Sequence, residues 1–262
     1  MLLCATAIIN YGQVKKSNDQ KRQERRERIN QLIKKEEEGA LIYYKQSAFG
    51  FKLNTDGWSG FYEHGKYKTI STTNIWWVEG GERKSPKEEK QSVTSFDGTF
   101  ITIGNPFVYG KENNFYYLKA GFGQQRLIGG KGNKNGVAVS AVYGAGIAGG
   151  YLKPYYITVS ELINGSHDIK YTDGSEAYYL DPTIIQGSPG FTKRMFEGEW
   201  TPGVLARAAL RFDYGKYNEI LSAVETGINA EYYGKKMPIM ALNPAKHFFF
   251  NAYVAIEFGK RK

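Results

Sequence analysis

Residues 247–258 read HFFFNAYVAIEF, and their polarity alternates with a period of two, which is typical of a β-strand. One face of this strand carries Asn251 and Glu257 among large aromatic side chains, as the interior of a small membrane barrel does. A terminal strand that ends in an aromatic residue also has the usual shape of the signal read by outer-membrane insertion machinery. We therefore predict a membrane-insertion strand, whose apolar face carries Phe248, Phe250, Ala252, Val254, Ile256 and Phe258.

Two upstream stretches, at residues 204–214 and 222–233, repeat this alternation. Arg207 and Arg211 lie on the polar face of the first, and Glu225 and Glu231 on the polar face of the second. Opposite charges on neighbouring antiparallel strands are expected to meet. In a sandwich this face would be the solvent side, but in a narrow barrel it would be an internal ion-pair network that plugs the lumen. We predict that this network contains Arg207, Arg211, Glu225, Glu231 and Glu257.

Five more strands are predicted, at residues 44–54, 58–67, 72–79, 115–128 and 136–159. The fifth is rich in glycine, which lets a strand bend or makes room for bulky interior side chains, and Pro154 indicates a bulge or an exit from the membrane. The total of about eight is even, as closure with both termini on one side requires, and eight strands enclose an interior that side chains fill. The predicted fold is therefore all-β, an antiparallel transmembrane β-barrel of about eight strands.

Long and short connections alternate between the predicted strands. Long loops are expected outside the cell and short turns in the periplasm, which places both termini in the periplasm. The hairpin turn Thr55–Gly57 departs from this scheme, because it is short where a long loop was allowed. The long connections are residues 80–113, 161–200 and 235–246.

The composition agrees with a barrel. Of 262 residues, 41% are hydrophobic and 15% aromatic, and glycine occurs 31 times. A chain that is apolar only at every second strand residue is polar on average, and the aromatic content excludes disorder of the whole chain. The single cysteine excludes a disulfide framework, a Cys-based zinc site and an iron–sulfur cluster.

The formal net charge of +9 suits nucleic acid, anionic lipid or lipopolysaccharide as a partner. Much of this charge lies in residues 15–38 and 259–262, and no nucleic-acid recognition pattern accompanies it. We predict outer-membrane lipid and lipopolysaccharide as partners, and no nucleic acid.

The N-terminal residues differ from the rest. Residues 1–13 resemble the second half of a secretory signal peptide without its basic first part, so we expect the true start to lie upstream; a buried strand or helix is the alternative. Residues 14–39 hold a dense charge run of helix-forming residues that ends at Gly39. We predict a short charged periplasmic helix or arm, acting as a partner contact or as a solvated leader, followed by the barrel at residues 40–262.

Several segments together carry a family resemblance: GALIYYKQSAFGFKLNTDGWSGFYEHGKYK, SPKE, YYLKAGFGQQRLIGGKGNKNGVAV, GYLKPYY, ETGINAEYYGKKMPIMA and FFFNAYVAIEFGK. Over residues 39–260 the chain resembles a family of outer-membrane β-barrel proteins from Bacteroidota. The resemblance implies an outer-membrane location and a barrel fold, and it implies no agreed biochemical activity.

An enzymatic function is an alternative, because several eight-stranded barrels modify lipid A with a Ser, a His and an acid at the rim. The chain has three histidines, and His167 stands between Ser166 and Asp168 in a predicted loop. Sequence neighbours do not converge as nucleophile, base and orienting acid, and no serine is implicated beside His64 or His247. We predict no catalytic residue, and we keep a lipid A-modifying enzyme as the alternative.

No cofactor and no metal site are predicted. The acidic residues Asp173, Glu176 and Asp181 share one long loop, but their spacing is not that of a calcium loop. Phosphate-loop and paired-histidine motifs are absent from the sequence.

The function predicted from these observations is an integral outer-membrane barrel that serves as a structural or accessory subunit of a cell-envelope assembly, secretion or transport complex. Envelope proteins are its expected partners, through the N-terminal helix or the long loops. The alternatives are a narrow pore for small solutes and a soluble lipocalin-like binding barrel. A lipocalin-like barrel would turn the apolar strand faces inward and the charged faces outward.

Overall fold

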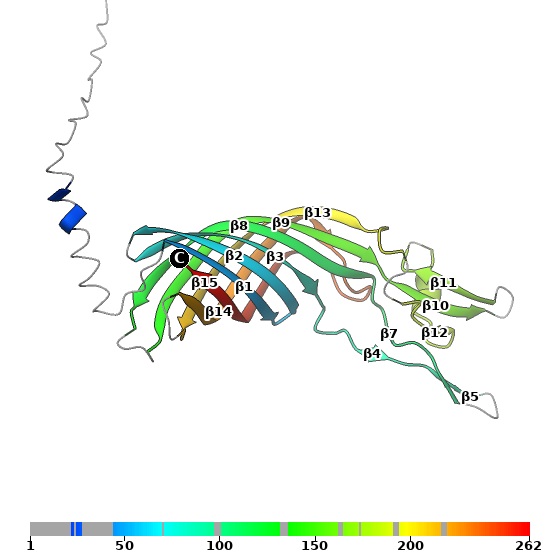
Figure 1. Cartoon of the computed structure of the whole chain (residues 1–262). Coiled ribbons are helices and arrows are strands. Elements are labelled where there is room, and N and C mark those ends of the chain that lie inside the picture. The colour runs from blue at the N-terminus through cyan, green and yellow to red at the C-terminus, as the bar shows by residue number, and fades with distance from the viewer. Residues whose placement is uncertain are drawn as a thin grey trace, which may run out of the picture.

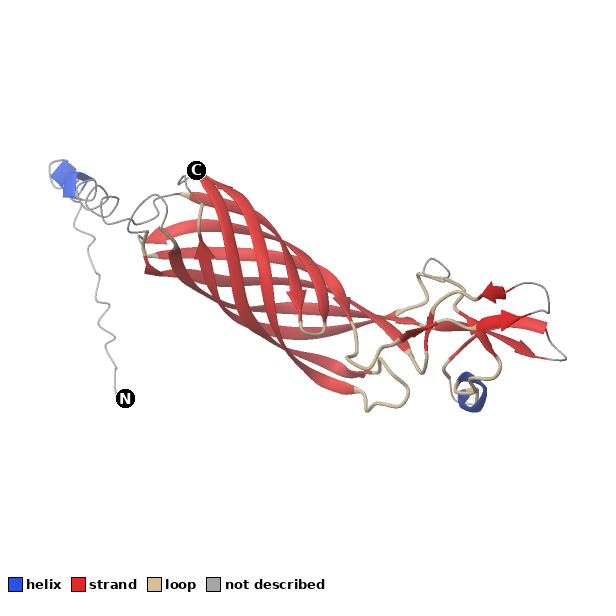
Figure 2. Ribbon diagram, turned by 90° about the horizontal axis from the view of Figure 1, so that it is seen from below, coloured by secondary structure: helices blue, strands red, loops and turns tan. Residues whose placement is uncertain are grey.

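The fold is a closed antiparallel β-barrel, which Figures 1 and 2 show from two directions. The computed structural model describes residues 22–23, 25–27, 44–69, 71–96, 101–131, 136–161, 165–172, 174–190, 194–215 and 219–262. Among these residues, eight strands close the ring in the order β1-β15-β14-β13-β9-β8-β3-β2, which confirms the predicted fold class. Their bounds are β1 (Lys45–Asn54), β2 (Gly57–Thr69), β3 (Thr72–Arg83), β8 (Asn113–Gly129), β9 (Ala138–Pro154), β13 (Glu199–Asp213), β14 (Ile220–Met237) and β15 (Lys246–Arg261).

Side chains alternate between the lumen and the outside along each barrel strand, because successive residues of a strand point to opposite faces. In the middle of β15, Tyr253 and Ala255 are buried while Val254 and Ile256 are exposed. Val254 lies opposite Leu53 of β1, which is also exposed on the outside. The period-two pattern of the sequence is therefore the inside–outside pattern of the barrel.

The two ends of the barrel differ. The backbone N–H of Tyr44 donates to the carbonyl of Lys262 over 2.7 Å, so the start of β1 and the C-terminus meet at one end, here called the terminus end. The connections that follow β1, β3, β9 and β14 lie at the opposite end, here called the loop end (Figure 2). The three long connections predicted from sequence are at the loop end, as is the short β1–β2 turn at residues 55–56.

The fifth predicted strand is shorter than expected, because it is two strands. β9 ends at Pro154, and after Tyr155 the chain enters β10 (Tyr156–Glu161), which leaves the barrel wall. β10 pairs with β11 (Gly165–Lys170) and with β12 (Ile185–Gly187) in a small separate sheet. Proline has no N–H to continue the barrel ladder, and the exit that Pro154 indicated lies at this residue.

The long loops at the loop end are folded. β4 (Lys90–Gln91) pairs with β7 (Phe107–Val108), and β5 (Thr94–Phe96) pairs with β6 (Ile101–Ile103). A one-turn helix, α2 (Glu176–Tyr179), packs beside the small sheet (Figure 2). We call the described residues of 90–108 and 155–198, which hold β4–β7, β10–β12 and α2, the loop-end unit. Its buried apolar core is Phe107, Ile157, Val159, Tyr179 and Ile185.

Glycines in β8 and β9 make room for a large interior side chain. A Cβ atom on Gly121 would lie 2.4 Å from the ring of Trp77, and one on Gly144 would lie 2.7 Å from it. Trp77 is buried, with 1% of its surface exposed. The glycine-rich stretch thus accommodates a bulky residue of β3, one of the two roles expected of it.

The structure describes two short stretches of the N-terminal residues. Residues 22–23 and 25–27 are helical, while residues 1–13 and the remainder of 14–39, where the signal peptide and the charged arm are predicted, lie outside the described residues. No helix in the described part of the chain is long and apolar enough to cross a membrane.

Candidate functional site

The barrel lumen is filled by charged side chains. All five side chains predicted for an interior network point into it and are at most 4% exposed: Arg207, Arg211, Glu225, Glu231 and Glu257. They come from β13, β14 and β15, and they meet further charges from strands on the opposite wall.

Arg211 is the centre of the network. Its Nη1 donates to Oε1 of Glu63 over 2.7 Å, and its Nη2 donates to Oε2 of Glu225 over 2.7 Å. Its Nε lies 3.1 Å from Oε2 of Glu257. Three buried carboxylates from β2, β14 and β15 therefore converge on one guanidinium, and Tyr253 adds a hydroxyl that donates to Glu225 over 2.6 Å.

The pairing of Arg207 differs from the prediction. The predicted partners were Glu225 and Glu231, but Nη2 of Arg207 donates to Oε2 of Glu63 over 2.6 Å, and its guanidinium lies 3.8 Å from the Trp77 ring centroid. The register explains the correction, because Arg207 lies opposite Asn229 while Glu231 lies opposite Leu205. Arg211 does lie opposite Glu225, and that predicted pair forms.

A second group of ion pairs lies nearer the loop end. Nζ of Lys119 is 2.7 Å from Oε1 of Glu231 and 3.4 Å from Oε1 of Glu79. Lys52 donates to the other oxygen of Glu79 over 2.6 Å, and Arg83 donates to Glu231 over 2.9 Å. The network thus also includes Lys52, Glu63, Glu79, Arg83 and Lys119, which were not predicted for it. Lys52, Glu63, Glu79 and Lys119 occupy lumen-facing positions of predicted strands, whereas Arg83 lies in the predicted long connection 80–113, because β3 extends to Arg83.

A third group closes the terminus end of the lumen. Nη2 of Arg261 lies 2.5 Å from Oδ2 of Asp213, and Nζ of Lys131 lies 3.3 Å from Oδ1 of the same carboxylate. Nε of Arg261 also donates to Gln46 over 3.0 Å. Polar contacts therefore occur in the lumen from the terminus end to the loop end, beside a buried apolar cluster that includes Trp77 and Phe115.

The buried charges of the first two groups are equal in number. Five cations face five buried carboxylates among the described residues: Lys52, Arg83, Lys119, Arg207 and Arg211 against Glu63, Glu79, Glu225, Glu231 and Glu257. The partly exposed Asp56 adds a sixth carboxylate at Arg83. A buried charge is tolerated when it is paired, and these ion pairs occupy the interior of the barrel.

The outside of the barrel is apolar. Exposed fractions of 48–60% are found for the predicted insertion-strand residues Phe248, Phe250, Val254, Ile256 and Phe258. Other strands around the barrel add exposed Phe49, Phe51, Phe122, Ile147 and Val204. We call this surface the apolar belt. The apolar strand faces thus point outward, whereas in a lipocalin-like barrel they line the interior.

The three histidines lie apart. Nδ1 of His64 is 2.9 Å from Oγ of Ser47, a partner that sequence reasoning missed because the β1–β2 register sets it. The His64 ring also packs against Trp76 on the outside of the barrel. Nδ1 of His247 lies 3.0 Å from the carbonyl of Tyr233.

The run around His167 is strand β11 rather than a loop. Oγ of Ser166 donates to Gln186 over 3.0 Å, whereas Asp168 accepts from Thr158 over 2.7 Å. Ser166 and Asp168 thus have separate hydrogen-bond partners outside this run. Within the described residues, no group of three or more His, Cys, Asp or Glu side chains is placed to hold a metal ion.

In the loop-end unit, burial shifts the pKa of Tyr179 and hydrogen bonding shifts the pKa of Asp181. Burial raises the pKa of Tyr179, whose hydroxyl donates to the carbonyl of Lys111 and so joins α2 to the segment before β8. Hydrogen bonds from the hydroxyl and backbone N–H of Thr183 lower the pKa of Asp181. Both contacts order the unit; neither brings acidic groups together.

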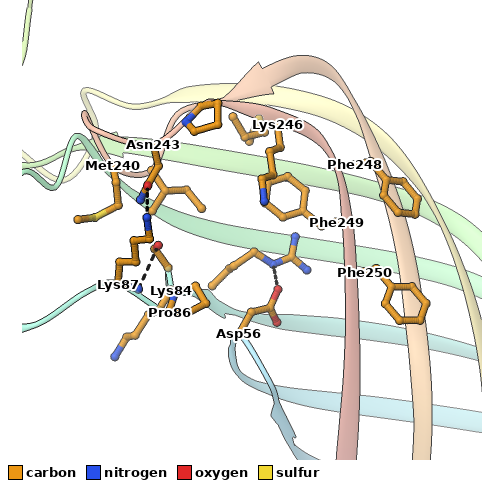
Figure 3. Close-up of a pocket in the computed structure, with 15 residues that line it drawn as sticks. Asp56, Lys84, Pro86, Lys87, Met240, Asn243, Lys246, Phe248, Phe249 and Phe250 are labelled. Carbon is orange, nitrogen blue, oxygen red and sulfur yellow. Dashed lines mark hydrogen bonds and ion pairs between the residues drawn. The ribbon is translucent and has the colours of Figure 1, made fainter.

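A cavity of about 470 Å³ opens at the loop end of the barrel, between the start of β15 and the segment after β3 (Figure 3). Asp56 of the β1–β2 turn lies at its base, and Lys87 donates to Asn243 across it over 3.0 Å. Cationic and apolar side chains line this cavity together.

Comparison with known proteins leaves the family open. No protein-family profile and no curated protein matches the chain. Among solved structures, it is similar to Neisserial surface protein A (8% identity, TM-score 0.38), with 83% of this chain and 94% of that chain covered. It is also similar to the N-terminal β-barrel domain of Pseudomonas aeruginosa OprF (10% identity, TM-score 0.34, 83% and 98% covered) and to the attachment invasion locus protein Ail of Yersinia pestis (9% identity, TM-score 0.35, 84% and 100% covered).

Proposed function

We propose that this chain is an integral outer-membrane β-barrel with a closed lumen, and that it serves as a structural or accessory subunit of a cell-envelope assembly, secretion or transport complex. The observation that carries the proposal is the facing of the side chains, with an apolar belt outside and a paired charge network inside. Contiguous apolar surface on this scale is unfavourable in water and favourable in lipid.

The outer membrane is the proposed location because closed antiparallel barrels are the β-structures that span membranes, and outer-membrane proteins are their main class. A tilted membrane-spanning strand needs about 9–11 residues. β8 and β9 have 17 residues each and β14 has 18, so they extend beyond the apolar belt. We place the loop end outside the cell and both termini in the periplasm, and the resemblance to barrels of Bacteroidota supports the same location.

The accessory role is supported by the loop-end unit. It has its own apolar core, and it leaves large apolar side chains exposed, among them Phe196 at 93% and Tyr178 at 57%. A small folded unit held on long strands presents a defined surface to a partner protein. We propose that envelope proteins bind through this unit or through the N-terminal arm, and that membrane lipid and lipopolysaccharide surround the barrel.

An enzyme is not part of the proposal. The Ser47–His64 pair faces the outside of the barrel, where the hydroxyl of Tyr62 donates to Ser47 over 3.5 Å and Trp76 packs on the His64 ring. A nucleophile–base pair needs a group that orients the base. These contacts supply aromatic neighbours in place of an orienting carboxylate, which favours an interfacial hydrogen bond over catalysis.

The closed lumen predicts that the barrel does not conduct. In planar bilayers, the purified chain is expected to give no steady current above that of the bare membrane. The reason is that the ion pairs around Arg211 and those around Lys119 occupy the cross-section of the lumen. Membrane fractionation and heat-modifiable gel mobility first establish that the protein in the assay is folded and inserted. Steady single-channel steps from inserted protein would contradict the closed lumen and favour the narrow-pore alternative.

The accessory role predicts a native assembly that depends on the loop-end unit. Extracted in mild detergent, the chain is expected to migrate on native gels in a species larger than its monomer, and the double variant Phe196→Ser, Tyr178→Ser should shift it toward the monomer. Lys66→Ser, an exposed substitution at the terminus end, is the control. A chain that migrates as a monomer under all extraction conditions would rule out a stable accessory subunit.

A further inference from the structure

The barrel wall has a notch at the loop end. Pairing of β1 with β15 ends at Asn54 and Tyr253, whereas pairing of β14 with β15 continues to Met237 and Lys246. Residues 246–251 of β15 therefore have a strand neighbour on one side only. At about 3.3 Å per residue, six residues correspond to about 20 Å of strand. The short β1–β2 hairpin, which the sequence predicted at Thr55–Gly57 where a long loop was allowed, is the reason that the wall is shorter here.

The cavity of about 470 Å³ occupies this notch. Its base is the β1–β2 turn, where Asp56 accepts from Nδ2 of Asn251 over 3.4 Å. Its sides are the start of β15 and, opposite, Arg83 at the end of β3 with residues 84–87 after it (Figure 3). The backbone N–H of Lys84 donates to the carbonyl of Asp56 over 2.7 Å, so the turn and the opposite side are joined.

Positive charge dominates the polar lining. Arg83, Lys84, Lys87 and Lys246 line the cavity, and Asp56 is the one carboxylate among its lining residues in the described part of the chain. Nζ of Lys84 also lies 3.7 Å from Oε2 of Glu82, in a partly exposed pair beside the cavity. Arg83 is 1% exposed; its Nε lies 2.6 Å from Asp56, its Nη2 donates to Glu231, and its Nη1 has no hydrogen-bond partner among the described residues. A buried guanidinium nitrogen without a partner in a cavity of excess positive charge points to an anion as the occupant.

The apolar lining connects the cavity to the outside of the barrel. Phe249 lies on the lumen side, where its ring centroid is 4.5 Å from the Arg83 guanidinium. Phe248 and Phe250, by contrast, belong to the apolar belt and are 55% and 60% exposed, yet they line the same cavity. An occupant can therefore contact the cations of the cavity and the belt at the same time.

We propose that the notch binds the phosphorylated headgroup of an anionic membrane lipid, with phosphate at Arg83 and the lysines and an acyl chain along Phe248 and Phe250. This proposal rests on the proposed membrane location. A soluble anion would use the cations and leave the apolar wall exposed, whereas a lipid of the surrounding leaflet uses both. The short hairpin then has a role, because a longer one would fill the space between β15 and β3.

Native mass spectrometry in detergent tests the proposal with phosphatidylglycerol and phosphatidylethanolamine as probes. The wild-type chain is expected to retain one phosphatidylglycerol in preference to the zwitterionic lipid. The variant Lys84→Gln, Lys87→Gln, Lys246→Gln should bind it at least about tenfold more weakly, since each lysine near an anionic lipid contributes several-fold to binding. The matched control, Lys170→Gln, Lys235→Gln, Lys236→Gln, removes three other lysines of the loop-end half and should bind as the wild type does.

Heat-modifiable mobility of each variant separates this inference from the proposed function. A chain that never inserts into lipid contradicts the membrane location itself. Inserted variants that all retain phosphatidylglycerol equally overturn the notch as its site. Displacement of the lipid by millimolar inorganic phosphate, with no effect of the acyl chain on affinity, overturns the lipid and leaves a site for a free anion.

Discussion

Replacing Arg211 by methionine is expected to lower the free energy of unfolding by about 3–5 kcal/mol, because it leaves buried carboxylates without their cation. Glu225 and Glu257 lose their guanidinium partner in that variant, and Glu63 retains Arg207 alone. The measurement is urea unfolding of the refolded protein in lipid vesicles, followed by tryptophan fluorescence and by gel mobility.

Two further variants identify the cause of this loss. Arg126→Met removes an exposed arginine of β8 and should change stability by no more than about 0.5 kcal/mol. Adding Glu225→Gln and Glu257→Gln to Arg211→Met should restore part of the lost stability, because the uncompensated charges are removed. If Arg211→Met unfolds at the same urea concentration as the wild type, the network is not a buried ion-pair plug.

Val254→Arg is expected to cost about 2–4 kcal/mol, the penalty for a cation at the lipid-facing middle of a membrane barrel. Val254 lies near the middle of β15, is 51% exposed, and is flanked by Leu53 of β1 and Thr226 of β14. Insertion into vesicles and unfolding in urea are the two measurements, and both should be impaired.

The control for Val254→Arg is Phe196→Arg, which places the same charge on an apolar residue of the loop-end unit that is 93% exposed. In water, an exposed arginine costs little, so this variant should insert as the wild type does. Equal and small effects of the two substitutions would mean that the apolar belt faces water, and the membrane location would then be wrong.

The barrel strands were predictable because their signal is local. The alternation in residues 247–258 predicts a strand, its buried face and its exposed face, and β15 has all three. The pair Arg211–Glu225 was also within reach, since two adjacent antiparallel strands with a short turn place these residues opposite each other.

The remaining partners of the network were beyond sequence reasoning. Glu63 and Arg211 are separated by 148 positions and meet only across the closed lumen. Which residues face each other there depends on the stagger of eight strands, and a shift of two residues would leave the same alternation in the sequence. The loop-end unit was missed because strands of two to six residues carry too few positions to show a period.

The amino-acid sequence by itself determined the all-β fold, the approximate strand positions and the polarity of each strand face, because side-chain direction along a strand follows from backbone geometry alone. Closure of the sheet decided the rest. It brought Glu63 of β2 to Arg211 of β13 and Glu231 of β14 to Lys119 of β8, and it set the short β1–β2 hairpin beside the longer β14–β15 pair, which leaves a notch in the wall. Each of these depends on which strands are neighbours and how far each extends, and those quantities exist only in the tertiary structure.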